Sequence, residues 1–356
     1  MDCPSHHPPP PPDELFDIDT TVDPTFIISL IRKLLPVDSG SGQRTQIKHN
    51  PSYGCQQCGS RILTTGLYGA GSTLWAECLQ SDDILRRVLW IAENTLNPHL
   101  IEKSVGLLLG ILEGESEVGK LLIPPLMTLG LTSLLINLLS FEMSKLVKER
   151  IPERYSVLEM ILRAIEALSA SDSRSKDICS SKELFHLVCD LMKLQDKAEV
   201  ATCCVTAGVL IANILSETVS FIPEISQDFS FLEGLFSTLP FASDDLEARR
   251  ALWSVIARLF ARVNESEIDT FSLRQYILVL LSNSDIIEDD LLIMQLEDSF
   301  PSHSSRTIAI QKIESMLNNW NIRKETLQED NMDGDGSLNT SDVRRLYDCC
   351  QRYISK

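Results

Sequence analysis

The sequence predicts an all-α protein in which helices stack in series as a solenoid, and three observations support this prediction. Of its 356 residues, 44% are hydrophobic but only 6% are aromatic, a balance that suits helices packed on helices better than a β-sandwich. From Ser72 onward, apolar residues recur at helical spacing, and no alternating strand pattern competes with them. The apolar segments also recur at a nearly regular interval along the sequence, which is typical of stacked repeats.

Four apolar segments carry the repeat: SVGLLLGILEG, LEMILRAIEALSA, AGVLIANILSE and ALWSVIARLFARV. Each holds one small residue within a stripe of Leu and Ile, namely Gly110, Ala164, Ala212 and Ala257. These small residues are 54, 48 and 45 positions apart, and periods of about 40–47 residues are typical of armadillo and HEAT solenoids. Because each segment is apolar on nearly every face, we expect it to pack against its sequential neighbours. A non-repetitive helical bundle with chance spacing is the alternative.

The chain is expected to divide into four parts. Residues 1–22 contain a proline run that favours extended polyproline II, and a disordered tail is predicted there. Residues 23–71 are predicted to form a short helix, ended by Pro36, and a polar flexible loop. Residues 72–303 hold the armadillo-like repeats, and residues 304–356 are predicted to form C-terminal helices around an EF-hand-like loop.

One segment imitates a membrane span. Residues 121–141 carry no charge over a length that could cross a bilayer. However, Pro124 and Pro125 interrupt a helix near its start, and Asn137 would lie unpaired in lipid. We therefore expect a short helix end, a proline turn and a second, buried helix, without membrane association.

The segment NMDGDGSLNTSD, residues 331–342, matches the loop of an EF-hand. Hard cations such as Ca²⁺ take six to eight oxygen ligands, and a tightly wound loop with Gly336 at its sharp turn can aim alternate side chains inward. The loop therefore predicts a weak Ca²⁺ site, the only cofactor that we expect. The predicted ligands are Asn331, Asp333, Asp335, Ser337 (through its backbone carbonyl), Asn339 and Asp342.

Three departures from the EF-hand pattern leave an alternative open. Asn331 removes a charge that Asp usually supplies, and Asp342 replaces the longer, bidentate Glu. The hand is also single, whereas EF-hands normally pair. Its sequence resembles one half of a dockerin repeat, but the second half is missing. The alternative is an acidic Asx-type turn at a helix end.

Other chemical motifs in the sequence are incomplete. Cys55 and Cys58 have the spacing of half a zinc site, but His49 would supply only a third ligand, so ordinary thiols in a loop are favoured. The stretch GLYGAGST has the spacing of a phosphate-binding loop, yet Ser72 stands where a Lys is required. We therefore expect neither zinc nor a nucleotide.

The sequence shows no catalytic constellation, and we expect no enzymatic activity. None of the six histidines lies beside a Ser or Cys in a recognisable nucleophile motif, and His186 is interpreted as a core residue. The acidic pairs at 244–245 and 289–290 precede helical stretches and are interpreted as helix caps. The ten cysteines lie mostly in apolar helical stretches, which favours buried, reduced thiols.

The net charge of −18 argues against direct binding to DNA, which needs clustered Lys and Arg. An acidic protein instead favours basic partners. We therefore expect a non-enzymatic scaffold that binds another protein, with a basic surface as one candidate, in the nucleus or cytoplasm. A calcium-regulated adaptor that uses the C-terminal loop is the second hypothesis. The sequence predicts no oligomeric state.

Residues 72–303 contain three segments that carry a family resemblance: LWAECLQSDDILRRVLWIAE, SVGLLLGILEGESEV and LLIMQLEDSFPS. With them the chain resembles the serum amyloid A-like 1 family of armadillo-like proteins. The resemblance implies an intracellular, largely nuclear protein linked to cell proliferation, without enzymatic activity and without defined ligand residues. It does not extend to the loop at residues 331–342.

Overall fold

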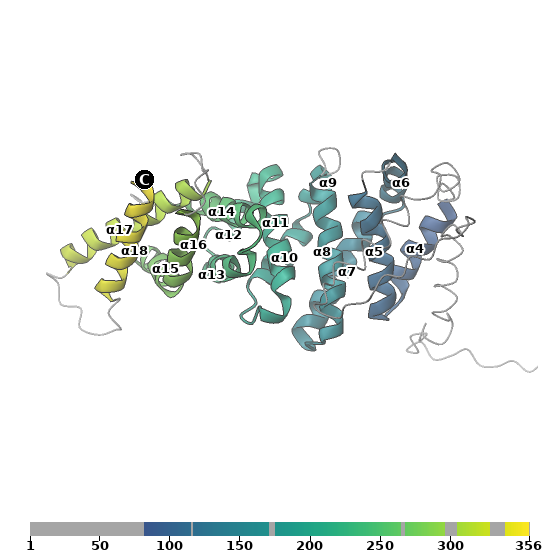
Figure 1. The fold of residues 1–356 in the computed structure, drawn as a ribbon, viewed down its shortest axis with the longest axis horizontal. Helices are drawn as coiled ribbons and strands as arrows, with labels where there is room; N and C mark the ends of the chain where they lie inside the picture. Colours follow the sequence, from purple (N-terminus) through teal and green to yellow (C-terminus); the bar gives the residue numbers. More distant parts are fainter. Residues whose placement is uncertain are drawn as a thin grey trace, which may run out of the picture. The chain divides into compact units, whose positions relative to one another are not determined.

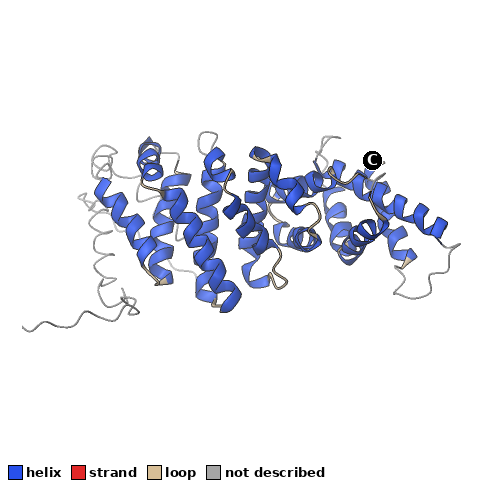
Figure 2. Ribbon diagram, turned by 180° about the vertical axis from the view of Figure 1, so that it is seen from behind, coloured by secondary structure: helices blue, strands red, loops and turns tan. Residues whose placement is uncertain are grey.

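The computed structural model describes residues 82–114, 117–170, 175–264, 268–295, 305–327 and 339–355. Within these ranges the chain forms fifteen α-helices, four 3-10 helices and no β-strand (Figures 1 and 2), so the predicted all-α class is confirmed. The expected tail (1–22) and the segment at 23–71 lie outside the described residues. The chain divides into two compact units, Met1–Leu134 and Leu135–Lys356, which are described separately.

The described part of the first unit is a run of packed helices. Its helices are α4 (Asp82–Asn94), α5 (Pro98–Glu113) and α6 (Glu117–Thr128). The side chain of Asn97 caps α5 by accepting hydrogen bonds from the backbone N–H groups of His99 (3.0 Å) and Leu100 (3.4 Å). Pro98 occupies the first turn, where no intrahelical donor is required. α5 packs against both α4 and α6 and buries most of its Leu and Ile side chains.

The break between α6 and α7 (Leu131–Lys148) lies at a glycine, not at the prolines. Pro124 and Pro125 are inside α6, so the predicted proline turn is wrong. Gly130 has a φ of 90°, which glycine adopts without a steric penalty, and this residue separates the two helices. The expected second, buried helix is confirmed as α7, with Asn137 on its exposed side.

The second unit repeats a pattern of a short, a medium and a long helix. α9 (5 residues), α10 (11) and α11 (17) are followed by α12 (4), α13 (10) and α14 (15). After α7 its elements are η2 (Pro152–Arg154), α8 (Tyr155–Ser169), α9 (Ser175–Cys179), α10 (Lys182–Met192), η3 (Ala198–Val200), α11 (Ala201–Glu217), η4 (Val219–Phe221), α12 (Ile222–Ile225), α13 (Phe229–Thr238), η5 (Leu239–Ala242), α14 (Leu246–Phe260), α15 (Thr270–Ser282), α16 (Ser284–Gln295), α17 (Ser305–Leu327) and α18 (Thr340–Ile354).

The long helices of successive repeats stack on one another: α8 packs on α11, α11 on α14 and α14 on α17 (Figure 1). The small residues Ala164, Ala212 and Ala257 are buried, so the predicted contacts among these three apolar segments are confirmed. Gly110 is different, because it lies on α5 of the first unit and is half-exposed. α17, which the sequence suggested as the incoming helix of an EF-hand, also continues the stack.

The hydrogen bonds between repeats have the same period as the apolar pattern. Such bonds join side chains on one repeat to groups about one period away, which a chance bundle would not produce. Four of them span 42 to 44 residues: Lys182 Nζ to Glu224 Oε1, Thr202 Oγ1 to Glu159 Oε2, Asn213 Nδ2 to Ser169 Oγ, and Arg258 Nη1 to the carbonyl of Leu215. The helical-repeat architecture therefore holds for the second unit.

Within the described residues, one helix is long and apolar enough to cross a membrane, namely Ala198–Glu217, and the pair Lys120–Thr128 and Leu131–Lys148 would pass as one broken span. The first of these contains α11. Because α11 packs against α8, α10 and α14, its apolar surface is that of a core helix.

The buried acid Asp290 joins three helices, and its predicted role as a helix cap is wrong. It lies within α16 and is 5% exposed. Its Oδ1 accepts hydrogen bonds from Arg249 Nε (3.0 Å) and Nη2 (2.6 Å), and its Oδ2 accepts one from Trp253 Nε1 (2.8 Å). Arg306 on α17 brings a second guanidinium to 3.8 Å. In the other acidic pair the prediction is confirmed for Asp245, which caps α14.

Candidate functional site

The predicted calcium loop is described at only two of its ligand positions, because Asn331, Asp333, Asp335 and Ser337 lie outside the described residues. The other two, Asn339 and Asp342, belong to the start of α18. The side-chain oxygen of Asn339 accepts hydrogen bonds from the backbone N–H (3.1 Å) and the hydroxyl (2.8 Å) of Ser341, so Asn339 is the N-cap. This is the Asx-type arrangement of the alternative interpretation.

The helices on either side of the loop are joined to each other. α17 packs on α18, and Lys324 Nζ donates a hydrogen bond of 2.7 Å to Thr340 Oγ1. This hydrogen bond joins the last described turns of α17 to the start of α18. No cluster of three or more His, Cys, Asp or Glu side chains that could hold a metal occurs among the described residues.

Two of the six histidines are in the described part of the chain, and both are on the surface. The ring of His99 is in the first turn of α5. His186 was interpreted as a core residue, but its side chain is 51% exposed, and its Nε2 lies 3.6 Å from Glu224 Oε2. The buried face of α10 is taken instead by Phe185 and Cys189, which explains the error.

The described cysteines are buried free thiols, as the sequence predicts. Burial raises the pKa of Cys179 and Cys204 to about 11 and that of Cys203 to about 12. Burial raises the pKa of Cys189 and Cys350 as well. Because the thiolate is the nucleophilic form, these thiols are unsuited to covalent catalysis at neutral pH.

These pKa shifts predict that the protein loses stability as the pH rises above about 9. In the unfolded chain the thiols ionise with their ordinary pKa of about 9, whereas the folded protein retains the protons. Lys197 opposes this trend above pH 8, because burial lowers its pKa to about 8. We expect the urea midpoint to fall between pH 8 and pH 10 under reducing conditions, and to fall less after Cys203→Ala and Cys204→Ala. A midpoint that rises over this range would contradict the prediction.

The stack leaves one exposed strip on each of α8, α11 and α14, and we call these strips together the stack face. Small side chains lie along its middle, where a partner's backbone can approach closely. Charged groups flank them. The residues of the stack face, all half-exposed or exposed, are Glu159, Arg163, Thr202, Thr206, Val209, Asn213, Ser216, Ala251, Ser254 and Arg258.

Side-chain hydrogen bonds join the strips of the stack face across neighbouring helices. Thr202 Oγ1 donates to Glu159 Oε2 (3.1 Å), which links α11 to α8. Arg258 Nη2 donates to Ser216 Oγ (3.1 Å), which links α14 to α11. Asn213 donates through its Nδ2 to Ser169, and its carbonyl oxygen remains able to accept a hydrogen bond. These bonds hold the polar groups in fixed positions.

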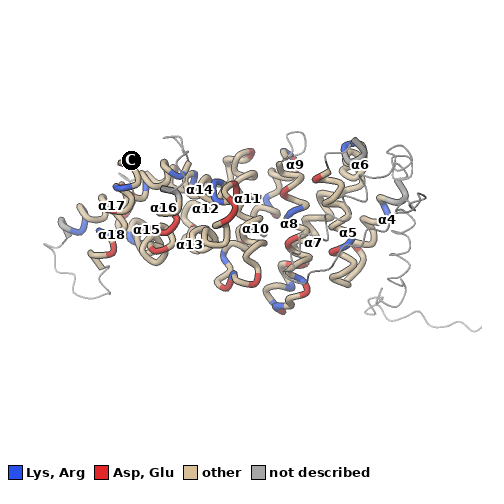
Figure 3. The backbone as a smooth tube through the Cα atoms, viewed as in Figure 1, with Lys and Arg blue, Asp and Glu red and all other residues tan. Residues whose placement is uncertain are grey.

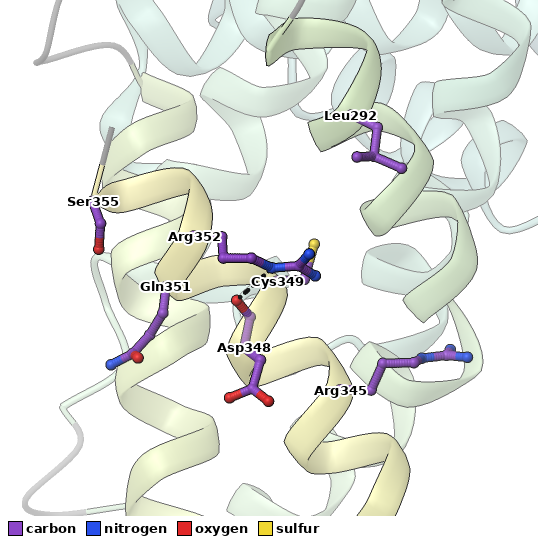
Figure 4. Close-up of a pocket in the computed structure, with 7 residues that line it drawn as sticks. All are labelled: Leu292, Arg345, Asp348, Cys349, Gln351, Arg352 and Ser355. Atoms are coloured by element: carbon purple, nitrogen blue, oxygen red, sulfur yellow. Dashed lines mark hydrogen bonds between the residues drawn. The ribbon is translucent and has the colours of Figure 1, made fainter.

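A groove between α16 and α18 is a second surface feature (Figure 4). Its cavity has a volume of about 830 Å³. Four of its lining residues on α18 follow a helical i, i+3, i+4, i+7 spacing and therefore lie on one face. The lining consists of Leu292 on α16 and of Arg345, Asp348, Cys349, Gln351, Arg352 and Ser355 on α18.

The charges of this groove are largely engaged. Arg345 donates to Asp285 Oδ1 (2.7 Å) and forms an ion pair with Glu288 Oε1 (3.0 Å), which raises the pKa of its guanidinium. Arg352 extends across the groove and donates through Nε to the carbonyl of Asp348 (3.2 Å), as Figure 4 shows. A ligand that binds Arg345 would therefore compete with Asp285 and Glu288.

Sequence reasoning missed the polar residues of the stack face. Asn213 and Arg258 each directly follow the small residues Ala212 and Ala257 that define the repeat. This shared position, one residue after the small residue of each repeat, was the sequence signal that could have located them. Charges of both signs are interspersed along the described helices (Figure 3), so charge alone could not locate the surface.

Comparisons with known proteins identify no family. No family model matches the chain, and no curated protein matches it. Among solved structures, the chain is similar to an engineered protein studied by the Northeast Structural Genomics Consortium, with 16% sequence identity and a TM-score of 0.40, over 84% of this chain and 68% of that chain. A TM-score of this size carries no argument. The resemblance to the serum amyloid A-like 1 family stays a prediction.

Proposed function

We propose that this chain is a non-enzymatic scaffold that binds a protein partner on the stack face. The observation that carries the proposal is the series of contacts from α8 through α11 to α14. These contacts bury one side of each long helix and leave a continuous strip of small and polar side chains across three repeats. Repeat proteins use extended surfaces of this kind to bind their partners.

A basic partner is supported by the net charge of the whole chain and not by the stack face itself, which carries Glu159, Arg163 and Arg258. A net charge of −18 attracts a partner with a basic surface over long range and repels the DNA backbone. Residues such as Thr206 and Ser254 would accommodate a backbone that approaches closely, and Asn213 would accept a hydrogen bond from it. The family resemblance supports an intracellular location, nuclear or cytoplasmic, and a link to cell proliferation.

Bulky substitutions on the stack face are expected to abolish partner binding. Thr206→Trp and Ser254→Trp should each reduce recovery of the partner from native extract by about tenfold or more, because a large ring blocks backbone approach at the centre of an interface. Ser230→Trp, on the exposed side of α13, is the matched control and should bind normally. Recovery is quantified by mass spectrometry on variants with unchanged thermal midpoints. If Thr206→Trp and Ser254→Trp recover as much partner as Ser230→Trp does, the binding site lies elsewhere.

A second candidate function, a calcium-regulated adaptor, is favoured by the hydrogen bond from Lys324 to Thr340 at the base of the 331–342 loop. A cation held by the loop would pull on helices that are already joined there. α17 would transmit the change, because it packs on both α14 and α18.

The adaptor proposal predicts that millimolar Ca²⁺ changes the fluorescence of Trp320 on α17. The signal is isolated by subtracting that of a Trp320→Phe variant. Asp333→Ala and Asp335→Ala should remove the response, because each deletes a carboxylate ligand. An unchanged signal at millimolar Ca²⁺ would eliminate the adaptor function and leave the scaffold proposal intact.

A further inference from the structure

A groove separate from the stack face lies where three helix ends meet. It has a volume of about 420 Å³ and is lined by residues that precede and begin α13, follow α14 and begin α15. Its walls include three aromatic residues, Phe229, Phe271 and Tyr276, together with Arg262 and Asp269. We call it the helix-end groove. A cavity of this size accommodates one or two side chains of a peptide.

The aromatic wall of the helix-end groove is rigid. The rings of Phe229 and Tyr276 meet edge to face, with centroids 4.9 Å apart, and Tyr276 also packs against Phe260 at 6.1 Å. The hydroxyl of Tyr276 donates a hydrogen bond of 2.5 Å to the carbonyl of Ser226, so its polar group is already engaged. The wall therefore presents aromatic carbon to a ligand, at little cost in side-chain entropy.

Phe271 gives the helix-end groove an exposed apolar edge. Phe271 is 69% exposed at the start of α15, although burial of a Phe side chain is favourable. Nothing in the capping of α15 requires an aromatic residue there, because the cap is made by Asp269 and Ser272. An exposed aromatic residue beside an aromatic wall is typical of a protein-binding site.

The two charged residues of the described walls, Arg262 and Asp269, differ in their partners. The carboxylate of Asp269 accepts hydrogen bonds from the backbone N–H (2.9 Å) and the hydroxyl (2.6 Å) of Ser272, and these bonds lower its pKa. Asp228, beside the groove in sequence, is paired with Lys193 at 2.8 Å. Arg262 is exposed, and its guanidinium has no counter-ion among the described residues.

We propose that the helix-end groove docks a short segment of a partner protein in which a Phe side chain lies next to Asp or Glu. The Phe would fill the space beside Phe229 and Phe271, and the carboxylate would pair with Arg262, since Arg binds carboxylates in a bidentate fashion. The proposal goes beyond the scaffold function, because it names a different surface with the opposite charge preference. Glu265 and Glu267 lie outside the described residues, and their charges make a cationic segment the competing occupant.

The test measures binding of three labelled peptides to the full chain by fluorescence anisotropy at low salt. The peptides are identical except that a central Phe is flanked by Glu, Gln or Lys. We expect the Glu-flanked peptide to bind about tenfold more tightly than the Gln-flanked one, and the Lys-flanked peptide to bind weakest. Arg262→Glu should reverse this order, and Phe271→Ala should weaken all binding about fivefold or more.

Matched controls separate the groove from general effects. Arg344→Glu makes the same charge change on the exposed side of α18, and Leu278→Ala truncates an exposed apolar residue on α15 outside the groove. Both should bind as the wild type does. The proposal is overturned by tightest binding of the Lys-flanked peptide, by equal or no binding of all three, or by an Arg262→Glu variant that behaves like its control. None of these results bears on the stack face, whose variants are scored by partner recovery.

Discussion

Asp290→Ala is expected to lower the free energy of unfolding by about 3–5 kcal/mol, because it leaves the buried Arg249 without its counter-ion. Arg249 is 1% exposed and Arg306 is 3% exposed. The side chain of Arg249 is only 2% exposed, so water cannot replace the lost carboxylate. The substitution also removes the acceptor of the Trp253 indole N–H. Urea denaturation followed by Trp fluorescence measures the loss.

Two further variants test this explanation. Asp289→Ala removes the neighbouring, exposed acid and should change stability by less than about 0.5 kcal/mol. Combining Asp290→Leu with Arg249→Met should restore part of the loss, since apolar residues often replace a buried ion pair without penalty. The contact between Arg306 and Asp290 would still be lost, so full recovery is not expected. A loss below about 1 kcal/mol for Asp290→Ala would show that the buried charges are solvated in another way.

Gly234→Ala is expected to destabilise the protein by about 2–3 kcal/mol, because the new methyl group has no space. A Cβ at this position on α13 would lie 2.1 Å from the carbonyl oxygen of Met192 at the end of α10. That oxygen is part of the backbone, so α13 and α10 must separate. The shift would also disturb Lys197, whose buried ammonium group donates hydrogen bonds to the Gly234 carbonyl, to Ser237 (2.9 Å) and to Thr238 (3.0 Å).

Gly208→Ala is the matched control for this prediction. A Cβ on Gly208 would lie 2.5 Å from Leu252 Cδ2, which is the end of a side chain and not part of the backbone. Replacing Gly by Ala in a helix contributes about 1 kcal/mol of stability, which offsets the repacking of Leu252. We expect the midpoint in urea to change little for Gly208→Ala and to fall strongly for Gly234→Ala. Equal effects would mean that backbone contact between α10 and α13 is not the cause.

Much of the second unit could be predicted from apolar spacing alone. The segments around Ala164, Ala212 and Ala257 are helices, and they pack in sequence order, because a helix that is apolar on most faces must be covered by its neighbours. Predictions about single residues were less reliable. His186 lies outside the core and Asp290 lies inside it, since a shift of one position along a helix turns a side chain by about 100°.

The candidate sites show the same limit. The EF-hand spacing of residues 331–342 is a local pattern. A helix cap and an ion site both favour residues such as Asn339 and Asp342, so the pattern does not distinguish the two. The stack face and the helix-end groove have no local signature. Arg262 and Phe229 are 33 positions apart and meet only because three helix ends converge.

By itself, the sequence determined that this protein is helical, that its long helices recur about every 45–54 residues, and that its net charge is −18. These properties depend on composition and on spacing along the chain. Only the tertiary structure decided which acid would be buried with Arg249, which glycine would lie against a backbone carbonyl, and which aromatic residue would stay exposed beside Arg262. Such outcomes depend on distances between helices, and a linear pattern does not contain those distances.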